Sequence, residues 1–304
     1  MKWKWLIVPA LLPLALGLAV AVSIASGQVE NKILYMRADM GTVALLGGLL
    51  LSGPATVFLL RELQVQRRRQ RDAARVHAQA AEERRRFLRR LDHELKNPLT
   101  AIRAGLANLS WVSTTEERQK ALDSVQTQTV RLGRLAADLR KLAELETRPL
   151  ELSPVKVADV LQEVLDVAQE RPEASGRRLT LTVPQAPWPL PAVNGDRDLL
   201  FLAVHNLVDN ALKFTGAGDT VEIRAFEDGA SVVVEVADTG PGIPEAEIYH
   251  VWEELYRGQS ARGIPGSGLG LALVHAIAER HGGQVGLRSR QGQGTVFTLQ
   301  LPVR

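Results

Sequence analysis

The feature that most constrains the fold of this 304-residue chain is a run of apolar residues spaced three or four apart. Residues at this spacing share one face of a helix, so they predict an amphipathic α-helix from Phe87 to Leu109. His93 lies about 200° round the helix from Leu91 and should therefore face solvent. Alone, such a histidine is usually an ordinary surface residue. The apolar face comprises Phe87, Leu91, Leu95, Leu99, Ile102, Leu106 and Leu109.

A second amphipathic helix is predicted from Leu122 to Ala143, where apolar and small residues again recur every three or four positions. Between the helices, Ser113 to Glu116 contains residues that favour the start of a helix. Two such helices joined by a short turn form an antiparallel hairpin. Because one hairpin cannot bury its own apolar stripe, we expect two copies to pair as a four-helix homodimer. The alternative is a monomeric hairpin that packs on the downstream domain.

Two apolar segments near the start, Leu6 to Ser26 and Met40 to Leu60, each have about the 20 residues needed to cross a bilayer. Basic residues flank both outer ends of the pair, which predicts cytoplasmic N- and C-termini. We therefore expect a membrane hairpin over residues 1–60, with spans at about 6–26 and 40–60, in the inner (cytoplasmic) cell membrane. The alternative for the first segment is a cleaved signal peptide.

Residues 61–83 are polar, rich in arginine, and free of glycine and proline, which predicts a continuous juxtamembrane signalling helix. Contact with anionic membrane lipid is expected for such a segment. A nucleic-acid partner is not expected, because the arginines directly follow an apolar segment rather than lie on a separate basic domain. The chain contains no cysteine, which excludes disulfides and thiolate chemistry.

The chain beyond the hairpin domain (residues 84–148) mixes helices with strands. A proline-containing linker at Thr147 to Pro154 introduces this part, residues 149–304. The mixture predicts an α/β sandwich, in which helices cover one side of a mostly antiparallel sheet. The patterns predict helices at 157–169, 196–214 and 268–281, and strands at 178–183, 220–226, 231–237, 284–288 and 295–301.

The first of three chemically informative stretches is the helical run from Asn206 to Phe214. Asn206, Asn210 and Lys213 are four and three positions apart, so they share one face of the helix. Asparagine carbonyls can bind Mg²⁺, and lysine supplies a positive charge to phosphates. A polar helix surface without a ligand is the alternative.

The second stretch runs from Asp238 to Pro244, directly after a valine-rich strand. Glycines at the end of a strand, here Gly240 and Gly242, let the backbone approach a ligand closely. The carboxylate of Asp238 could accept a hydrogen bond from an amino group such as that of adenine. Alone, an Asp-Thr-Gly sequence could be only a turn.

The third stretch is the glycine-rich opening of a helix, with Gly266, Gly268 and Gly270 at alternate positions. Backbone N–H groups at a helix start favour an anion, and glycines leave room for phosphate. A flexible loop is the alternative. The stretch is not the dinucleotide-binding fingerprint, because no parallel strand precedes it.

In this order, the three stretches resemble the N, G1 and G2 boxes of sensor histidine kinases of two-component systems, which belong to the GHKL ATPase superfamily. The sequence from His93 to Leu99 is similar to the H box of that family. The resemblance covers Arg84 to Pro302. It implies a HisKA-type dimerisation domain, a Bergerat-type ATP-binding domain, and transfer of phosphate from ATP to a histidine. An aspartate of a separate response regulator would then receive the phosphate, and the resemblance also allows dephosphorylation of that regulator.

The resemblance also implies a role for each residue. His93 would be the phosphoacceptor and Glu94 the general base, while Asn97 would position water for dephosphorylation. Asn210 would hold Mg²⁺ on the phosphates of ATP, and Asp238 would bind adenine. The other residues expected at the ATP site are Asn206, Lys213, Gly240, Gly242, Gly266, Gly268, Gly270 and Thr295.

The chain departs from the family pattern in three places. Trp252 and Leu255 stand where phenylalanines are usual, and Leu199 stands where the family often has arginine. The interval between Leu60 and Arg84 is too short for a complete HAMP module. Three rival functions stay open: a member whose main activity is dephosphorylation of the regulator, a pseudokinase scaffold that only binds ATP, and a GHKL serine kinase.

Overall fold

The computed structural model describes residues 40–109, 111, 114–261 and 263–303, together with positions 19, 22, 23 and 26. The chain divides into two compact units, Met1–His77 and Ala78–Arg304. Helix α2 (Met40–Leu109) belongs to both units, and all of the tertiary structure described below lies in the larger one.

The predicted membrane hairpin is wrong. Among the helices of the described residues, none is long and apolar enough to cross a membrane. The segment 40–60 is not a separate helix but the beginning of α2, which extends over 70 residues into charged sequence. The first expected span, 6–26, lies outside the described residues apart from four positions.

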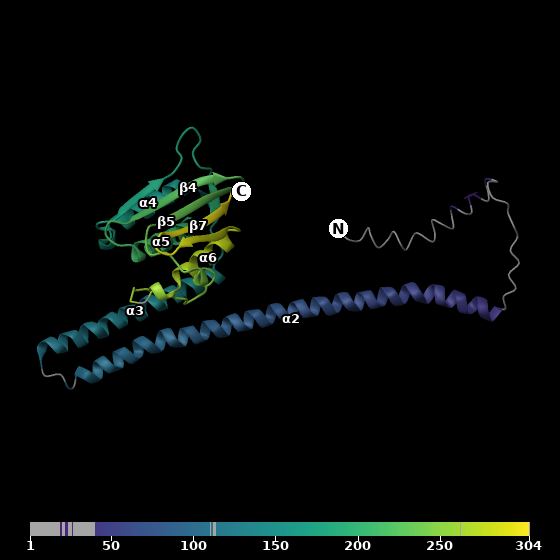
Figure 1. Ribbon diagram of the computed structural model, residues 1–304, viewed down its shortest axis with the longest axis horizontal. Helices are drawn as coiled ribbons and strands as arrows, with labels where there is room; N and C mark the ends of the chain where they lie inside the picture. Colours follow the sequence, from purple (N-terminus) through teal and green to yellow (C-terminus); the bar gives the residue numbers. More distant parts are fainter. Residues whose placement is uncertain are drawn as a thin grey trace. The chain divides into compact units, whose positions relative to one another are not determined.

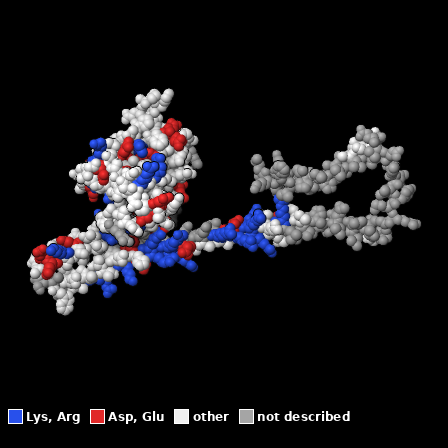
Figure 2. Space-filling model, viewed as in Figure 1, with Lys and Arg blue, Asp and Glu red and all other residues white. Residues whose placement is uncertain are grey.

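The predicted location in a membrane, with two spans and cytoplasmic termini, is wrong for the same reason. The expected lipid contact of the arginine-rich segment depended on those spans. Within the larger unit, arginines of α2 lie exposed at Arg84, Arg85, Arg86 and Arg89, among the basic side chains that Figure 2 shows in blue along the helix. Solvated basic side chains on an exposed helix face need no ligand to explain them.

The predicted helix hairpin is confirmed. Helix α2 ends at Leu109 and α3 (Thr115–Thr147) follows. Thr114 caps α3, because its hydroxyl accepts a hydrogen bond from the N–H of Glu117 at 3.3 Å and donates to the Glu117 carboxylate at 2.8 Å. The two helices approach closely at Gly105, where a Cβ would lie 2.7 Å from Cγ2 of Val125.

The apolar face of α2 divides into two parts. Phe87, Leu91 and Leu95 pack against a small cluster that joins the hairpin to the downstream domain. Leu99 and Leu106 are 49% and 52% exposed in the single chain. The remaining members of the cluster are Leu135, Leu139, Leu142, Leu255 and Leu269. Two of the seven predicted apolar positions are therefore exposed within one chain, while the other five are partly buried.

The C-terminal domain is the predicted α/β sandwich. Its five-stranded sheet has the order β2-β4-β5-β7-β6, and all neighbouring pairs are antiparallel except the parallel pair β2 and β4. Helices α4, α5 and α6 pack on one face of the sheet (Figure 1). The strands are β2 (Arg178–Thr182), β4 (Thr220–Asp228), β5 (Ser231–Asp238), β6 (Gln284–Arg290) and β7 (Gly294–Pro302), and the helices are α4 (Val157–Gln169), α5 (Arg197–Phe214) and α6 (Gly270–Arg280).

Several short elements were not predicted. Strand β1 (Ser153–Val155), at the end of the expected linker, and strand β3 (Val193–Gly195) form a separate antiparallel pair. Three-residue segments carry too little periodicity to be identified as strands from sequence. The short 3₁₀ helices are η1 (Pro172–Ala174), η2 (Glu245–Glu247) and η3 (Gln259–Ala261).

Helix α5 lies at the centre of the hydrophobic core. It contacts α4 and α6 on its two sides and strands β4 and β5 beneath. Burial of its apolar face is the main favourable contribution to its stability. The buried residues of α5 are Leu200, Ala203, Val204, Leu207, Val208, Ala211 and Leu212.

Asp196 anchors the start of α5. One carboxylate oxygen accepts from the N–H of Leu199 at 3.3 Å as the helix cap, and the other accepts from the N–H of Glu151 at 3.2 Å. Its own N–H donates to Nε2 of the buried His281 at 3.0 Å. Asp196 therefore fixes the helix, the linker and the end of α6 relative to one another.

Replacing Asp196 by alanine should destabilise the domain. Loss of a helix cap and of one further, partly buried hydrogen bond is expected to lower the free energy of unfolding by about 2 kcal/mol. Thermal denaturation followed by circular dichroism measures the effect. Asp198→Ala is the matched control, because Asp198 lies exposed in the first turn of the same helix and contributes only through the helix dipole. Equal midpoints for the two variants would contradict the anchoring role.

Candidate functional site

The larger unit contains a cavity of about 1190 Å³ between α5, the hairpin helix α3 and the segment that leads into α6. Its lining includes Glu94 of α2 and nine of the ten residues predicted for the ATP site. His93, Asn97 and Gly240 are not among the lining residues. The predicted residues that line it are Asn206, Asn210, Lys213, Asp238, Gly242, Gly266, Gly268, Gly270 and Thr295.

The polar face of α5 carries two amides on the cavity wall. The amide nitrogen of Asn206 donates to the carbonyl of Leu202 at 2.8 Å, which leaves its oxygen as the free acceptor. The Asn210 amide has no hydrogen bond to another described residue. Across the described part of the chain, no group of three or more His, Cys, Asp or Glu side chains could hold a metal ion. An amide oxygen is a ligand type that Mg²⁺ accepts beside phosphate oxygens and water.

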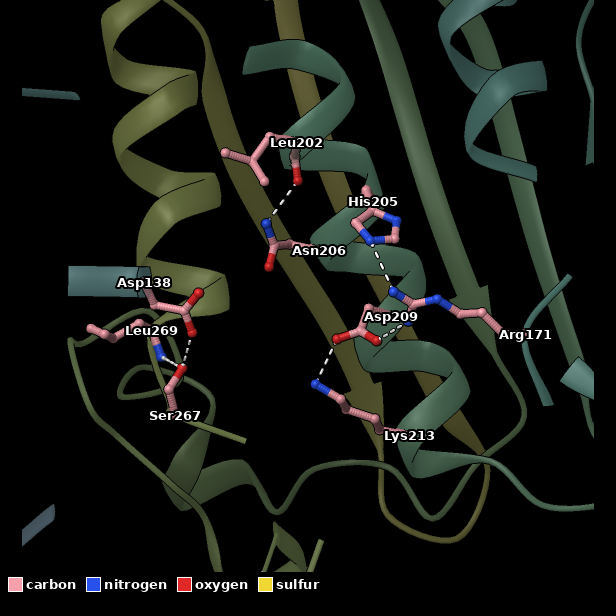
Figure 3. Close-up of polar contacts among 9 residues, drawn as sticks. All are labelled: Asp138, Arg171, Leu202, His205, Asn206, Asp209, Lys213, Ser267 and Leu269. Atoms are coloured by element: carbon pink, nitrogen blue, oxygen red, sulfur yellow. Dashed lines mark hydrogen bonds and ion pairs between the residues drawn. The ribbon is translucent and has the colours of Figure 1, made fainter. Parts of the chain in front are cut away.

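Asp209 lies on the same helix, between two cations (Figure 3). Its carboxylate forms an ion pair with Nζ of Lys213 at 2.5 Å and another with the guanidinium of Arg171. Burial would raise the pKa of Asp209, but the hydrogen bonds and charges of Lys213 and Arg171 outweigh burial and lower the pKa. Asp209 is therefore ionised at neutral pH.

His205 completes this group. Its Nε2 lies 3.1 Å from Nη2 of Arg171, and its ring stacks on Phe201 with centroids 5.7 Å apart. Burial, followed by the charge of Arg171, lowers the pKa of His205, so its imidazole is neutral at pH 7. His205, Asp209 and Arg171 were not among the residues predicted from the sequence. For Asp209 a signal was present, since it stands four residues before Lys213 on one helix face.

Asp238 ends β5 inside the cavity and is 9% exposed. Its Oδ1 accepts from the N–H of Gly240 at 2.9 Å. Burial raises the pKa of Asp238, and the hydrogen bonds from the N–H groups of Gly240 and Thr295 offset only part of that rise. Thr295 is the partner of Asp238 in the ladder between β5 and β7, so the structure brings these two predicted residues together.

The predicted glycines differ in how strictly their positions require glycine. Gly242 has φ +67°, and a Cβ there would lie 2.2 Å from the carbonyl oxygen of Arg290. Gly268 has φ +74°, and a Cβ would lie 2.9 Å from the backbone of Leu255. In contrast, a Cβ on Gly266 would meet nothing within 4 Å. Only the first two positions need both the left-handed conformation and the absence of a side chain.

The segment before α6 also contacts the helix hairpin. Oγ of Ser267 donates to Asp138 of α3 at 2.7 Å. Arg90 of α2 forms an ion pair with Glu253 and lies over the ring of Tyr256, 5.7 Å from its centroid. The segment between β5 and α6 is thus held by side chains of both hairpin helices.

His93 and its neighbours lie on the exposed surface of α2. His93 and Asn97 are exposed, as the spacing predicts, whereas Glu94 is partly buried and forms an ion pair with Arg131 of α3 at 2.7 Å. Successive side chains on a helix are about 100° apart, so Glu94 can line the cavity while His93 points elsewhere. The structure therefore does not bring His93 to the cavity.

Two families of known domains match the chain. Residues 83–148 match the family described as "His Kinase A (phospho-acceptor) domain". Residues 195–304 match the family described as "Histidine kinase-, DNA gyrase B-, and HSP90-like ATPase". These matches coincide with the hairpin that carries His93 and with the part of the α/β domain that forms the cavity.

Individual proteins are also similar. The sensor-like histidine kinase SenX3 of Mycobacterium tuberculosis is 34% identical over 239 residues, which are 77% of this chain and 56% of SenX3. More generally, the chain spans about half the length of the curated relatives it matches, 47% and 55% for two of them.

Solved structures agree. Full-length ShkA in complex with AMPPNP is 30% identical, with a TM-score of 0.51 over 70% of this chain and 44% of ShkA. The histidine kinase ThkA in complex with the response regulator protein TrrA shares the fold at 21% identity, with a TM-score of 0.58 over 72% of this chain and 61% of ThkA. Through its phosphoacceptor hairpin and its ATPase domain, the chain belongs to the sensor histidine kinases of two-component systems.

Proposed function

We propose that this chain binds ATP in the cavity and transfers its γ-phosphoryl group to His93. The observation that carries the proposal is the convergence of three separate stretches, namely the polar face of α5, Asp238 and the glycine-rich segment, on one cavity beside the hairpin. The AMPPNP complex of the related ShkA supports a nucleotide as the ligand.

The chemistry of the lining suits each part of ATP. Asp238 is an ionisable acceptor in a buried position, which suits the amino group of adenine. Lys213 and the backbone N–H groups from Gly268 to Gly270 suit the phosphates. Asn210, with Asn206 one turn away, would hold Mg²⁺ through an amide oxygen. When bound, the ion would neutralise the charge that builds on the phosphates during transfer.

Phosphoryl transfer to His93 breaks the bond between the γ-phosphorus and the bridging oxygen of ADP and forms a bond from that phosphorus to an imidazole nitrogen. The proton of that nitrogen must leave, and Glu94 is the neighbouring carboxylate proposed to accept it. The ion pair of Glu94 with Arg131 involves Oε2, so the other oxygen keeps acceptor capacity.

Two partners follow from the same proposal. The exposed Leu99 and Leu106 on α2 would be covered by a second copy of the chain in a four-helix homodimer. An aspartate of a separate response regulator would receive the phosphoryl group, as the complex of the fold relative ThkA with TrrA supports. Asn97, exposed one turn after His93, would position water when the regulator is dephosphorylated.

Removing the acceptor should abolish labelling. After incubation with Mg²⁺ and γ-labelled ATP, we expect the full chain to carry acid-labile, base-stable phosphate, and His93→Gln to carry none. Asp92→Asn is the control, because Asp92 is the exposed neighbour on the same helix and should label normally. Acid-stable label, or normal labelling of His93→Gln, would disprove the proposal.

Asp238→Asn should weaken ATP binding without lowering the stability of the fold. Because folding raises the pKa of Asp238, the neutral carboxyl contributes stability that is fully present below the unfolded pKa and is lost as pH rises through the folded pKa. At pH 7 the ionised, buried carboxylate therefore destabilises the fold, and asparagine removes that cost. We expect an unchanged or higher melting temperature together with ATP affinity at least about 10-fold weaker, measured by thermal denaturation and calorimetry. A variant that binds ATP normally would contradict the adenine role.

Alanine substitutions should distinguish two of the glycines. Gly268→Ala is expected to lower ATP affinity about 10-fold or more, because it forces a side chain into a left-handed, closely packed position. Gly266→Ala should stay within about threefold of wild type, since its Cβ would meet nothing within 4 Å. Calorimetric titration with ATP gives both affinities. A stronger effect at position 266 than at 268 would show that the glycine-rich segment has a different conformation when it binds.

A further inference from the structure

Four side chains form a connected group on the cavity wall: Arg171, His205, Asp209 and Lys213 (Figure 3). Three of them belong to α5, while Arg171 comes from the segment between α4 and η1. Asp209 lies in the middle and pairs with both cations, and His205 contacts Arg171 from the other side. The function proposed above assigns a role only to Lys213.

The charges of this group do not cancel. Two cationic side chains, Arg171 and Lys213, form ion pairs with the single carboxylate of Asp209, and Nε2 of His205 contacts the guanidinium, so the group carries a net formal charge of about +1. Without Arg171, the pair of Asp209 and Lys213 would be neutral. The Asp209 carboxylate would then attract the Lys213 ammonium without competition from a second cation. The ammonium would be less available to the phosphate oxygens.

The contact between His205 and Arg171 leaves one buried polar group without a partner, and this energetic cost also indicates a role for Arg171. Because Nε2 of His205 accepts from the guanidinium, the proton of the neutral ring lies on Nδ1. Nδ1 is buried and has no hydrogen-bond partner among the described residues. An apolar side chain at this position of α5 would avoid that cost. The histidine is therefore best explained by the orientation that it gives to Arg171.

We propose that Arg171 is a positioning residue for binding of the nucleotide phosphates. It shares the carboxylate of Asp209 with Lys213, which keeps the ammonium available to phosphate oxygens and keeps this wall of the cavity positive. The inference rests on the proposed function and extends it to a residue outside the three stretches found in the sequence. Its effect should depend on the number of phosphates, because adenine and ribose carry no charge.

The test compares ligands that differ only in their phosphates. Isothermal titration calorimetry of the full chain with ATP, ADP and adenosine gives three affinities for each variant. Arg171→Met removes the charge and keeps most of the side-chain length. We expect it to weaken ATP binding about 10-fold, as the loss of one nearby charge predicts, to weaken ADP less, and to leave adenosine within about twofold. Arg171→Lys should return ATP affinity to within about threefold of wild type.

The matched control is Arg197→Met. Arg197 of α5 also forms an ion pair that joins this helix to α4, through Glu163, but it does not line the cavity. It should leave the affinities for all three ligands unchanged. If Arg171→Met does not fold, Arg171→Gln provides the same test, because glutamine can still donate a hydrogen bond to Asp209 without a charge.

Two results would overturn the inference. An unchanged ATP affinity in Arg171→Met would show that the charge has no effect on phosphate binding. An equal loss for ATP and adenosine would show that Arg171 only holds the fold of the cavity wall. Failure of the proposed function would look different, since the wild-type chain itself would then bind no ATP, and both proposals would be lost.

Discussion

The rest of the structure depends on the packing of α5 between the sheet and its two neighbouring helices. Its apolar face is fully buried, and its start is anchored by Asp196 to the linker and to His281. Because the buried face fixes the rotation of the helix, the opposite face with Asn206, Asn210 and Lys213 is fixed on the cavity wall. Core stability and ligand binding are therefore properties of the same helix, and a change on one face affects the other through its orientation.

Two carboxylates on the cavity wall, the partly buried Asp209 and the buried Asp238, have opposite electrostatic surroundings. Asp209 lies between Lys213 and Arg171, which lower its pKa despite burial. Asp238 has only backbone N–H donors to offset burial, and its pKa is raised. The first carboxylate is satisfied by the protein itself and organises cations for a ligand. The second lacks a full set of donors, which suits a carboxylate that completes its hydrogen bonds with a bound ligand.

Much of the architecture followed from residue patterns, because long periodic segments are strongly determined by which residues they must bury. The hairpin and the α/β sandwich were identified, and α4 was placed with its observed bounds. Strands β1 and β3 were missed, since three residues show no period, and the parallel pairing of β2 with β4 depends on a crossover rather than on local sequence. The membrane hairpin was wrong because apolar composition alone does not show where a helix begins and ends.

The sequence by itself determined the family, through the stretches around His93, Asn210, Asp238 and the glycines, because motif residues lie close together along the chain and their spacing is visible. Only the tertiary structure decided which side chains complete the cavity. Arg171 stands 38 residues from Asp209 and reaches it only because α4 packs beside α5. The physical reason is that hydrophobic burial places whole elements beside one another, and an ion pair across two elements leaves no periodic trace in either one.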